Sequence, residues 1–381
     1  MTPLKEIRVL EFTLNISGAL TGQILASFGA EVTKIERIGT GDDCRSFGPP
    51  FVSGASVMYN AYNRGKSSVT LDLKTEEAIE WVHRQLAECD VLIENMRPGN
   101  MQELGLGQKE LRARYPRLVY CSLSAFGSSG PWAARPGYEE VVQAFSGLFS
   151  VNGAENSPTS RVGAQILDMG TGVWAALGCV VALMARNTTG KGAIVTGSLL
   201  ETGLGWLTLP LGTYSVSKQL PARSRSGGAS VAPYRCFAAS DGEIVIAAIN
   251  DRLFIRLCSA LGHPEWAVQE RFKKARSRAS HRLEIHALIE PIVAQQDRAF
   301  WLEKLGQAGV PCAPVNNLED VLSNDHVRQL DLFAGVAGSE LRLVTLPISI
   351  DNSRGIKLSS APALGSANQK FGLPVESKTE K

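Results

Sequence analysis

The sequence predicts an α/β protein built around a parallel β-sheet with helices on both faces. In the first third of the chain, compact apolar runs of strand length alternate with runs whose apolar residues recur at helical spacing, a rhythm typical of parallel sheets. The length of 381 residues exceeds one typical core and predicts two domains. A stretch rich in Ser, Gly, Arg and Pro near residue 215 indicates a linker or loop.

The first strand–helix–strand unit opens the chain. "IRVLEF" (7–12) is a compact apolar strand, and "GALTGQILASFG" (18–29) repeats apolar residues at helical spacing until Gly29 ends the helix. "EVTKIER" (31–37) alternates apolar and polar residues, as expected of a second strand.

Further strands and a capped helix follow. "SSVTLDL" (67–73) is a strand, and "TEEAIEWVHRQLAECD" (75–90) is an amphipathic helix that Thr75 can cap. "VLIENM" (91–96) and "LVYCSLSAF" (118–126) are buried strands. In parallel sheets ligands bind beyond the carboxyl ends of the strands, so the site is expected there.

The later part of the chain has a different pattern. "SVSKQLPARSRSGGASVAP" (215–233) is the linker or loop, and "YRCFAASDGEIVIAAI" (234–249) predicts a hairpin that turns at Asp241-Gly242. Helical patterns occupy 251–305, and "GVPCAPVNNLEDVL" (309–322) predicts a strand, a turn and a helix.

Composition argues against several classes of partner. The net charge of +2 gives no general reason to expect nucleic acid or an anionic membrane. The basic run at 271–282 lacks interleaved aromatic residues, which favours a solvated helix face. The apolar run at 173–185 is too short to cross a bilayer and predicts a buried helix.

The cysteines and histidines form no recognisable site. Seven cysteines without CxxC spacing, and no secretory signal, predict a reduced protein of the cytoplasm. The five histidines show no compact metal-binding pattern.

Asp168, in "GAQILDMGTGVWAALG" (163–178), is the candidate reactive group. A short apolar run ends at this aspartate and an apolar helical pattern follows. One interpretation is a helix N-cap, because Asp accepts backbone N–H bonds well at that position. The other is a nucleophile at the carboxyl end of a strand, where Gly170 and Gly172 would let a ligand approach the backbone.

Segments along nearly the whole chain resemble the class III CoA-transferase family, to which formyl-CoA transferase belongs. The segments occur in the family's order. They are "IRVLEF", "GAEVTKIERIGTGDDCR", "YNRGKSSVTLDLKT", "DVLIENMRPGNMQELGLG", "AFGSSGPWAARPGYEEVVQAFSGL", "RVGAQILDMGTGVWAALG", "PYRCFAASDGEIVIAAINDRLFIRLCSALG" and "AGVPCAPVNNLEDVLSNDHV".

This resemblance implies a set of site residues. The family's catalytic aspartate falls on Asp168, and the glycine loop that covers the thioester falls on Gly227 and Gly228. The implied CoA contacts are Ile16, Ser17, Arg37, Leu71, Asp72, Leu73, Lys74, Asn95, Arg97, Arg135 and Tyr138.

The resemblance also implies the chemistry. Asp168 would attack the thioester of an acyl-CoA and carry the acyl group as an anhydride while CoA passes to a free carboxylic acid. Water must be excluded, because the anhydride would hydrolyse. Acyl-CoA is then a substrate, and neither a metal nor a tightly bound cofactor is required. A short dicarboxylic acyl-CoA is the expected donor, with Arg45 or Arg161 as candidates to meet its distal carboxylate.

Three alternatives remain open. The related α-methylacyl-CoA racemases carry a histidine as a proton-transfer group where this chain has Tyr138, and a phenol is a poor replacement. A non-catalytic acyl-CoA-binding protein would tolerate loss of the Asp168 carboxylate. A dehydrogenase-like enzyme is disfavoured because no G-x-G-x-x-G fingerprint is present.

The architecture implied by the resemblance has two domains and two chains. Residues 1–219 and 326–381 would form a large Rossmann-like domain, and residues 220–325 a small α+β domain. Two such chains would form an interlocked homodimer.

Overall fold

The structure, a computed structural model, describes residues 2–228, 230–358 and 360–375. These residues form two compact units. The first contains the chain up to residue 148, residues 162–209 and the chain from residue 331, and the second contains residues 149–161 and 210–330. A division into folding domains after residues 219 and 325 stays a prediction.

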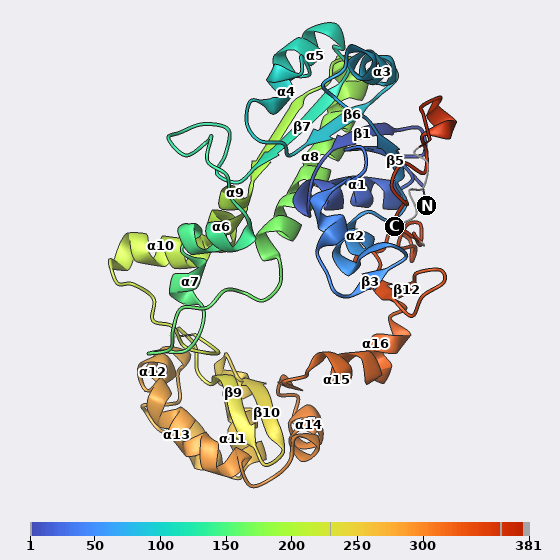
Figure 1. Cartoon of the computed structure of the whole chain (residues 1–381). Helices are drawn as coiled ribbons and strands as arrows, with labels where there is room; N and C mark the ends of the chain where they lie inside the picture. The colour runs from blue at the N-terminus through green and yellow to red at the C-terminus, as the bar shows by residue number, and fades with distance from the viewer. Residues whose placement is uncertain (1, 229, 359, 376–381) are drawn as a thin grey trace. The chain divides into compact units, whose positions relative to one another are not determined.

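A six-stranded parallel sheet is the centre of the first unit (Figure 1). All its strand pairs run in parallel, so the carboxyl ends of the strands lie along one edge. The predicted strands are confirmed, and β8 is an addition that was not predicted. The strand order is β5 (Ser67–Thr70), β2 (Glu31–Glu36), β1 (Arg8–Phe12), β6 (Val91–Glu94), β7 (Val119–Ser124) and β8 (Ile194–Ser198).

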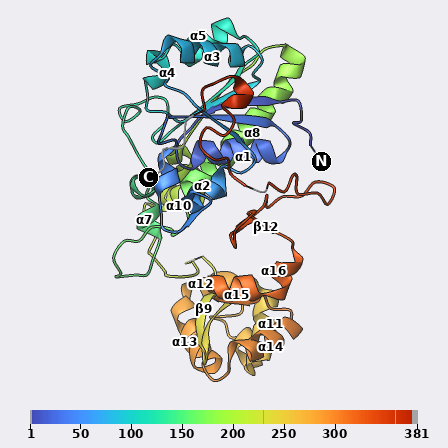
Figure 2. The same ribbon diagram turned by 45° about the vertical axis from the view of Figure 1, so that its right-hand side comes forward.

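Successive strand residues face opposite sides of this sheet, and helices cover both. Val9, Val91 and Val119 pack with α1 (Ser17–Ser27) and α8 (Ile166–Thr189), which lie side by side in Figure 1 and Figure 2. Leu10, Leu92 and Tyr120 pack into the other cluster. That cluster includes residues of α3 (Glu76–Leu86), α4 (Asn100–Glu103) and α5 (Gln108–Arg114). The alternation follows from the two-residue period of a strand.

Shorter elements complete this unit. They are β3 (Phe51–Val52), β4 (Ala55–Ser56), α2 (Val57–Tyr62), α6 (Glu139–Ser146), α9 (Leu199–Trp206), β12 (Phe333–Gly335) and β13 (Arg342–Val344). Helix α10 (Thr208–Ser217) runs from the first unit into the second.

Helix α8 begins earlier than the sequence predicted. Its first residue is Ile166 and its N-cap is Gln165, so Asp168 is the third helical residue. Both interpretations of the local pattern were therefore wrong about position, because Asp168 neither ends a strand nor caps the helix. An apolar run of two residues does not distinguish a strand from the first turn of a buried helix.

Helix α8 also extends beyond the predicted run, to Thr189. By length and composition it could cross a bilayer, but half of its apolar window is buried inside the fold. The core helix of a soluble protein can pass the same test of length and composition.

The second unit has its own core. Strands β9 (Tyr234–Ala239) and β10 (Gly242–Ala247) form the predicted hairpin, and β11 (Cys312–Pro314) pairs with β10. The accompanying helices are α11 (Asp251–Leu261), α12 (Ala275–Ser280), α13 (Arg282–Val293), α14 (Arg298–Gln307), α15 (Leu318–Ser323) and α16 (Asp325–Gln329).

The basic run at 271–282 is not wholly a solvated face. Arg278 is fully buried. It pairs with Asp251 and donates to the carbonyl oxygens of Ala232 and Phe272.

Candidate active site

Asp168 lies in the wall of a cavity of about 310 Å³ beyond the carboxyl ends of β1, β6 and β7. Loops that leave these strands supply the other walls, as expected for a parallel sheet. The cavity brings together six of the predicted site residues: Ser17, Asn95, Arg97, Arg135, Tyr138 and Asp168.

A larger cavity of about 700 Å³ adjoins the first one. The two cavities share Leu14 and Met96 in their walls. The larger cavity is mainly apolar, with the cationic side chains of Arg37 and Lys74 in its wall. Its walls contain five further predicted residues: Arg37, Leu71, Asp72, Leu73 and Lys74.

Three predicted residues lie outside these walls. Ile16 is buried and lines neither cavity. Gly227 and Gly228 belong to the second unit. At Gly227 φ is +81°, and a Cβ atom would lie 2.0 Å from the Tyr234 carbonyl oxygen, so the turn itself requires glycine there. A role for either glycine above a thioester stays a prediction.

The carboxylate of Glu139 caps helix α8 from a different helix. Glu139 begins α6 and is buried. Its Oε2 accepts a hydrogen bond from the Asp168 backbone N–H at 2.8 Å, and its Oε1 accepts one from the Leu167 N–H at 3.1 Å. The Gln143 side-chain amide also donates to Oε1, at 2.6 Å. Glu139 thus fixes the backbone that carries Asp168 and supplies the acceptor that the N-terminus of a helix requires.

Glu139 was not predicted as a site residue. The available signal was its position directly after Tyr138, which was assigned to a contact segment. The cap joins residues 29 positions apart, and a local capping rule does not detect such a pair.

The surroundings of Asp168 disfavour its charge. Burial, and then the negative charge of Glu139, raises the pKa of Asp168 from 3.8 to about 7. A hydrogen bond from the Ser17 side chain lowers it in part. A carboxylate with this pKa is more basic than an ordinary aspartate and is still about half ionised at neutral pH.

The loop after β1 is held from two sides. The Asn95 side chain accepts from the Leu14 N–H and donates to the Leu14 carbonyl oxygen, both at 2.8 Å. Asn15 has a φ of +61°, and its N–H donates to Asp42 Oδ1 at 3.1 Å. Asn95 therefore positions a loop beside the cavity, and the direct CoA contact that the resemblance implied for it stays a prediction.

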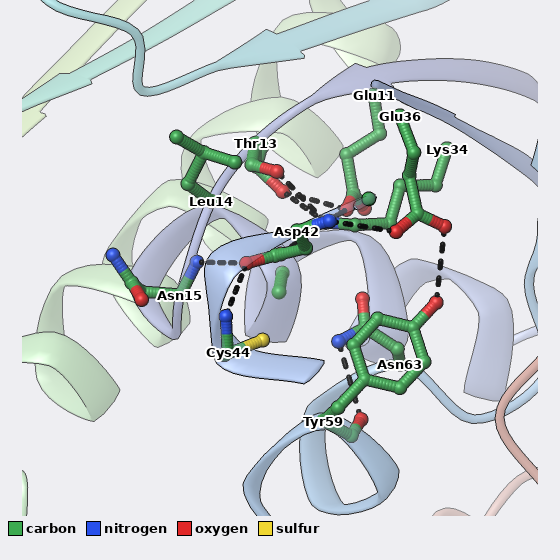
Figure 3. A network of polar contacts seen from close by, with 12 residues as sticks. Glu11, Thr13, Leu14, Asn15, Lys34, Glu36, Asp42, Cys44, Tyr59 and Asn63 are labelled. Atoms are coloured by element: carbon green, nitrogen blue, oxygen red, sulfur yellow. Dashed lines mark hydrogen bonds and ion pairs between the residues drawn. The ribbon is translucent and has the colours of Figure 1, made fainter. Parts of the chain in front are cut away.

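A buried ionic network supports the same loop (Figure 3). Lys34 is fully buried, and its Nζ lies 3.1 Å from Glu11 Oε1 and 2.9 Å from Asp42 Oδ2. It also donates to the Thr13 carbonyl oxygen at 2.8 Å. The network fixes the path of residues 13–15 because breaking a buried ion pair leaves an uncompensated charge.

Gly170 and Gly172 serve helix packing. A Cβ atom at Gly172 would lie 2.8 Å from the Ser17 carbonyl oxygen of α1, and one at Gly170 would lie 2.7 Å from the Thr202 side chain of α9. The expectation that these glycines admit a ligand to the backbone was wrong, because neighbouring helices occupy that space.

Within residues 2–228, 230–358 and 360–375, no group of three or more His, Cys, Asp or Glu side chains is arranged to hold a metal ion. The chemistry that these residues offer is that of a basic carboxylate beside two adjoining cavities.

Comparison with known proteins gives a family match over most of the chain. The family model described as CoA-transferase family III matches residues 4–368. Succinyl-CoA:glutarate CoA-transferase of Mus musculus is 32% identical over 368 residues, which are 96% of this chain and 84% of the relative. Acetyl-CoA:oxalate CoA-transferase of Acetobacter aceti is 38% identical over 314 residues, which are 82% of this chain and 80% of the relative.

Solved structures agree with this match. A CAIB/BAIF family protein from Brucella suis has a TM-score of 0.86 and 33% identity, and the alignment covers 97% of this chain and 98% of that one. Rv3272 from M. tuberculosis has a TM-score of 0.88 and 30% identity, with 97% and 99% covered.

Proposed function

Since the chain belongs to CoA-transferase family III, whose members move CoA from an acyl-CoA to a free acid, we propose that Asp168 is the nucleophile of this transfer. The observation that carries the proposal is a carboxylate of raised pKa, with its backbone fixed by Glu139, in the wall of the smaller of two adjoining cavities. An ionised carboxylate needs no general base, and a raised pKa makes it a stronger nucleophile.

The transfer proceeds through balanced acyl exchanges. An Asp168 oxygen attacks the thioester carbonyl carbon, and the carbon–sulfur bond breaks. CoA thiolate is released, and an acyl–aspartyl anhydride is formed. The thiolate then attacks the Asp168 carbonyl carbon, which releases the donor acid and forms an aspartyl–CoA thioester. The acceptor carboxylate displaces the thiolate from this thioester and forms a second anhydride with Asp168. The thiolate then attacks the acceptor's carbonyl carbon, and the bond from that carbon to the Asp168 oxygen breaks. Acceptor-CoA and the free Asp168 carboxylate result, with no net proton or redox change.

The adjoining cavities suit the extended shape of CoA. The larger one provides apolar walls for the adenine, and Arg37 and Lys74 provide positive charge for the phosphates. The narrow pantetheine arm would pass Leu14 and Met96 to bring its sulfur to Asp168. Arg37 also forms an ion pair with Asp43, so phosphate binding would compete with that partner.

An apolar face of α8 supports a homodimer as the working unit. Trp174, Leu177, Val181 and Met184 are each more than half exposed. They recur at helical spacing on the one long helix that also carries Asp168. A contiguous exposed apolar face marks an interaction site, and a second copy of the chain is the occupant that the resemblance implies. The interlocked form of this dimer belongs to the proposal.

Dicarboxylic acids are the proposed substrate class. Relatives bear the names succinyl-CoA:glutarate and succinate–glutarate CoA-transferase. We therefore assign a short dicarboxylic acyl-CoA, of the kind those names describe, as the donor for this chain.

A screen of donors and acceptors tests the function. The purified protein is mixed with a panel of acyl-CoAs and free acids, and new acyl-CoAs are identified by mass spectrometry. We expect CoA exchange by the wild type and none by Asp168→Asn, with Asp72→Asn as the control for a carboxylate lost from the CoA cavity. Exchange by Asp168→Asn at the wild-type rate would refute the nucleophile. Exchange of the α-proton with deuterated water, without CoA transfer, would indicate the racemase alternative.

A further inference from the structure

A third cavity, of about 340 Å³, is lined in part by Met169, the residue after Asp168, and has no role in the steps above. Its walls come from α1, α2, α8 and residues 343–347, 356 and 358 of the C-terminal part. They are mainly apolar, with Ile24, Met169 and Leu346 among them. The volume is within the range of small-molecule pockets, roughly 300–1,000 Å³.

Arg64, in the wall of this cavity, is a buried cation that pairs with no carboxylate of the described residues. It is 4% exposed, and its Nε atom is buried without a hydrogen-bond partner. One Nη2 hydrogen is donated to the Val344 carbonyl oxygen, at 2.7 Å. Burial lowers the pKa of Arg64, and no neighbouring carboxylate opposes this effect.

The other buried cations of the described chain are all paired. Lys34 and Lys66 contact Glu11, Arg186 contacts Asp90 and Arg278 contacts Asp251. An isolated buried charge is costly. Arg186 and Arg278 each have one buried unpaired guanidinium nitrogen as well, so what distinguishes Arg64 is that its guanidinium pairs with no carboxylate of the described residues.

Arg45, a predicted partner for the distal carboxylate of a substrate, differs from Arg64 because its guanidinium already has partners in the protein. Its guanidinium pairs with Glu36 at 2.7 Å and also donates to the Tyr59 hydroxyl. Arg45 therefore already has a carboxylate partner, and its role toward a substrate, like that of Arg161, stays a prediction.

The cavity wall includes a chain neighbour of the reactive carboxylate. Met169 follows Asp168 directly and lines the cavity. Tyr62, the last residue of α2, lines it as well. After burial, the charges of Asp168 and Glu139 raise the pKa of the Tyr62 phenol, so Tyr62 is within electrostatic range of both carboxylates.

We propose that this cavity binds the acyl part of the acid substrate and that Arg64 pairs with the distal carboxylate of a linear dicarboxylic acid. The proposal rests on the proposed function and specifies how that site selects its substrate. The proximal carboxylate would lie at Asp168, the methylene chain along the apolar wall, and the distal carboxylate would accept from the Arg64 guanidinium. A charge-assisted bond of this kind also removes the cost of the unpaired guanidinium.

Acceptor selectivity tests the inference. Acetyl-CoA is the donor, and kcat/KM is measured for succinate and glutarate against butyrate and valerate, which have the same chain lengths and one carboxylate. The wild type should prefer the diacids. Arg64→Gln should reduce that preference by about 30- to 5,000-fold, the usual effect of truncating one partner of a buried charged pair. Arg64→Lys, which keeps the charge, should retain part of it.

A second variant addresses the cavity without touching the cation. Ile24→Phe narrows the cavity and should reduce kcat/KM for glutarate more than for succinate. This result would support the cavity as the acyl site even if Arg64→Gln folded poorly. Equal losses for both diacids would count against it.

Further measurements separate this inference from the function on which it rests. If acetyl-CoA labels Asp168 in Arg64→Gln and the diacid preference is unchanged, the function stands and the inference fails. If no variant transfers CoA, calorimetric titration of glutarate and valerate into the wild type and Arg64→Gln still decides it. Selective glutarate binding that Arg64→Gln abolishes supports the inference, and identical binding to both proteins overturns it.

Discussion

Replacing Asp168 by asparagine should stabilise the folded protein at alkaline pH. The folded pKa of about 7 lies above the value of 3.8 expected for the unfolded chain, so folding favours the protonated form. The penalty for ionising the buried group therefore grows as pH rises from 4 and is complete above 7. Three pKa units correspond to about 4 kcal/mol, an upper limit because Asp168 is only half-buried. At pH 5 the same relation leaves less than half of this amount.

Urea denaturation at pH 5 and pH 8.5 measures the difference. Asp168→Asn should exceed the wild type in the free energy of unfolding, and the excess should be larger at pH 8.5. Asp331→Asn is the matched control, because the Lys357 partner lowers the pKa of that exposed carboxyl. The difference in the free energy of unfolding between Asp331→Asn and the wild type should therefore change with pH only below about pH 4. If the excess for Asp168→Asn were absent, or the same at both pH values, the carboxylate would not be in a desolvated site.

Other expected outcomes concern the pH profile, CoA affinity and assembly. Glu139→Gln should move the acid limb of the kcat/KM profile to lower pH, because one of the causes that raise the pKa of Asp168 is removed; an unmoved limb in a folded variant would contradict this. Arg37→Ala and Lys74→Ala should each raise KM for acyl-CoA by about 10-fold, as loss of one charge-assisted phosphate contact predicts, and a steady-state titration that shows no change would remove them from the CoA site. Leu177→Asp should convert a dimer into a monomer, which light scattering detects, and a wild type that is itself monomeric would contradict the proposed assembly.

The main elements of the sheet could be predicted because a buried strand requires a run of apolar residues that is visible locally in the sequence. "IRVLEF" and "VLIENM" are apolar runs of strand length, and both form central strands of the sheet. The Thr75 cap was equally local, and its side chain accepts from the Ala78 N–H at 3.3 Å. Most of the predicted contact residues also lie in two adjoining cavities, because parallel strands bring their carboxyl ends to one edge.

The groups that set the chemistry could not be predicted in this way. Glu139 reaches Asp168 from another helix, and the alternating pattern around Lys34 gave no sign that this lysine is fully buried. Arg64 has no carboxylate partner among the described residues. Only the folded chain shows this, because the wall around Arg64 is formed by segments far apart in the sequence. Tertiary contacts decided each of these cases.

Chemical trapping of the acyl-enzyme would test the central claim most directly. The protein is incubated with acyl-CoA and hydroxylamine, and its peptides are sequenced by mass spectrometry. A hydroxamate on the side chain of Asp168, formed only when acyl-CoA is present, is the predicted result. Continued CoA transfer with the label on another residue would contradict the assignment of the nucleophile.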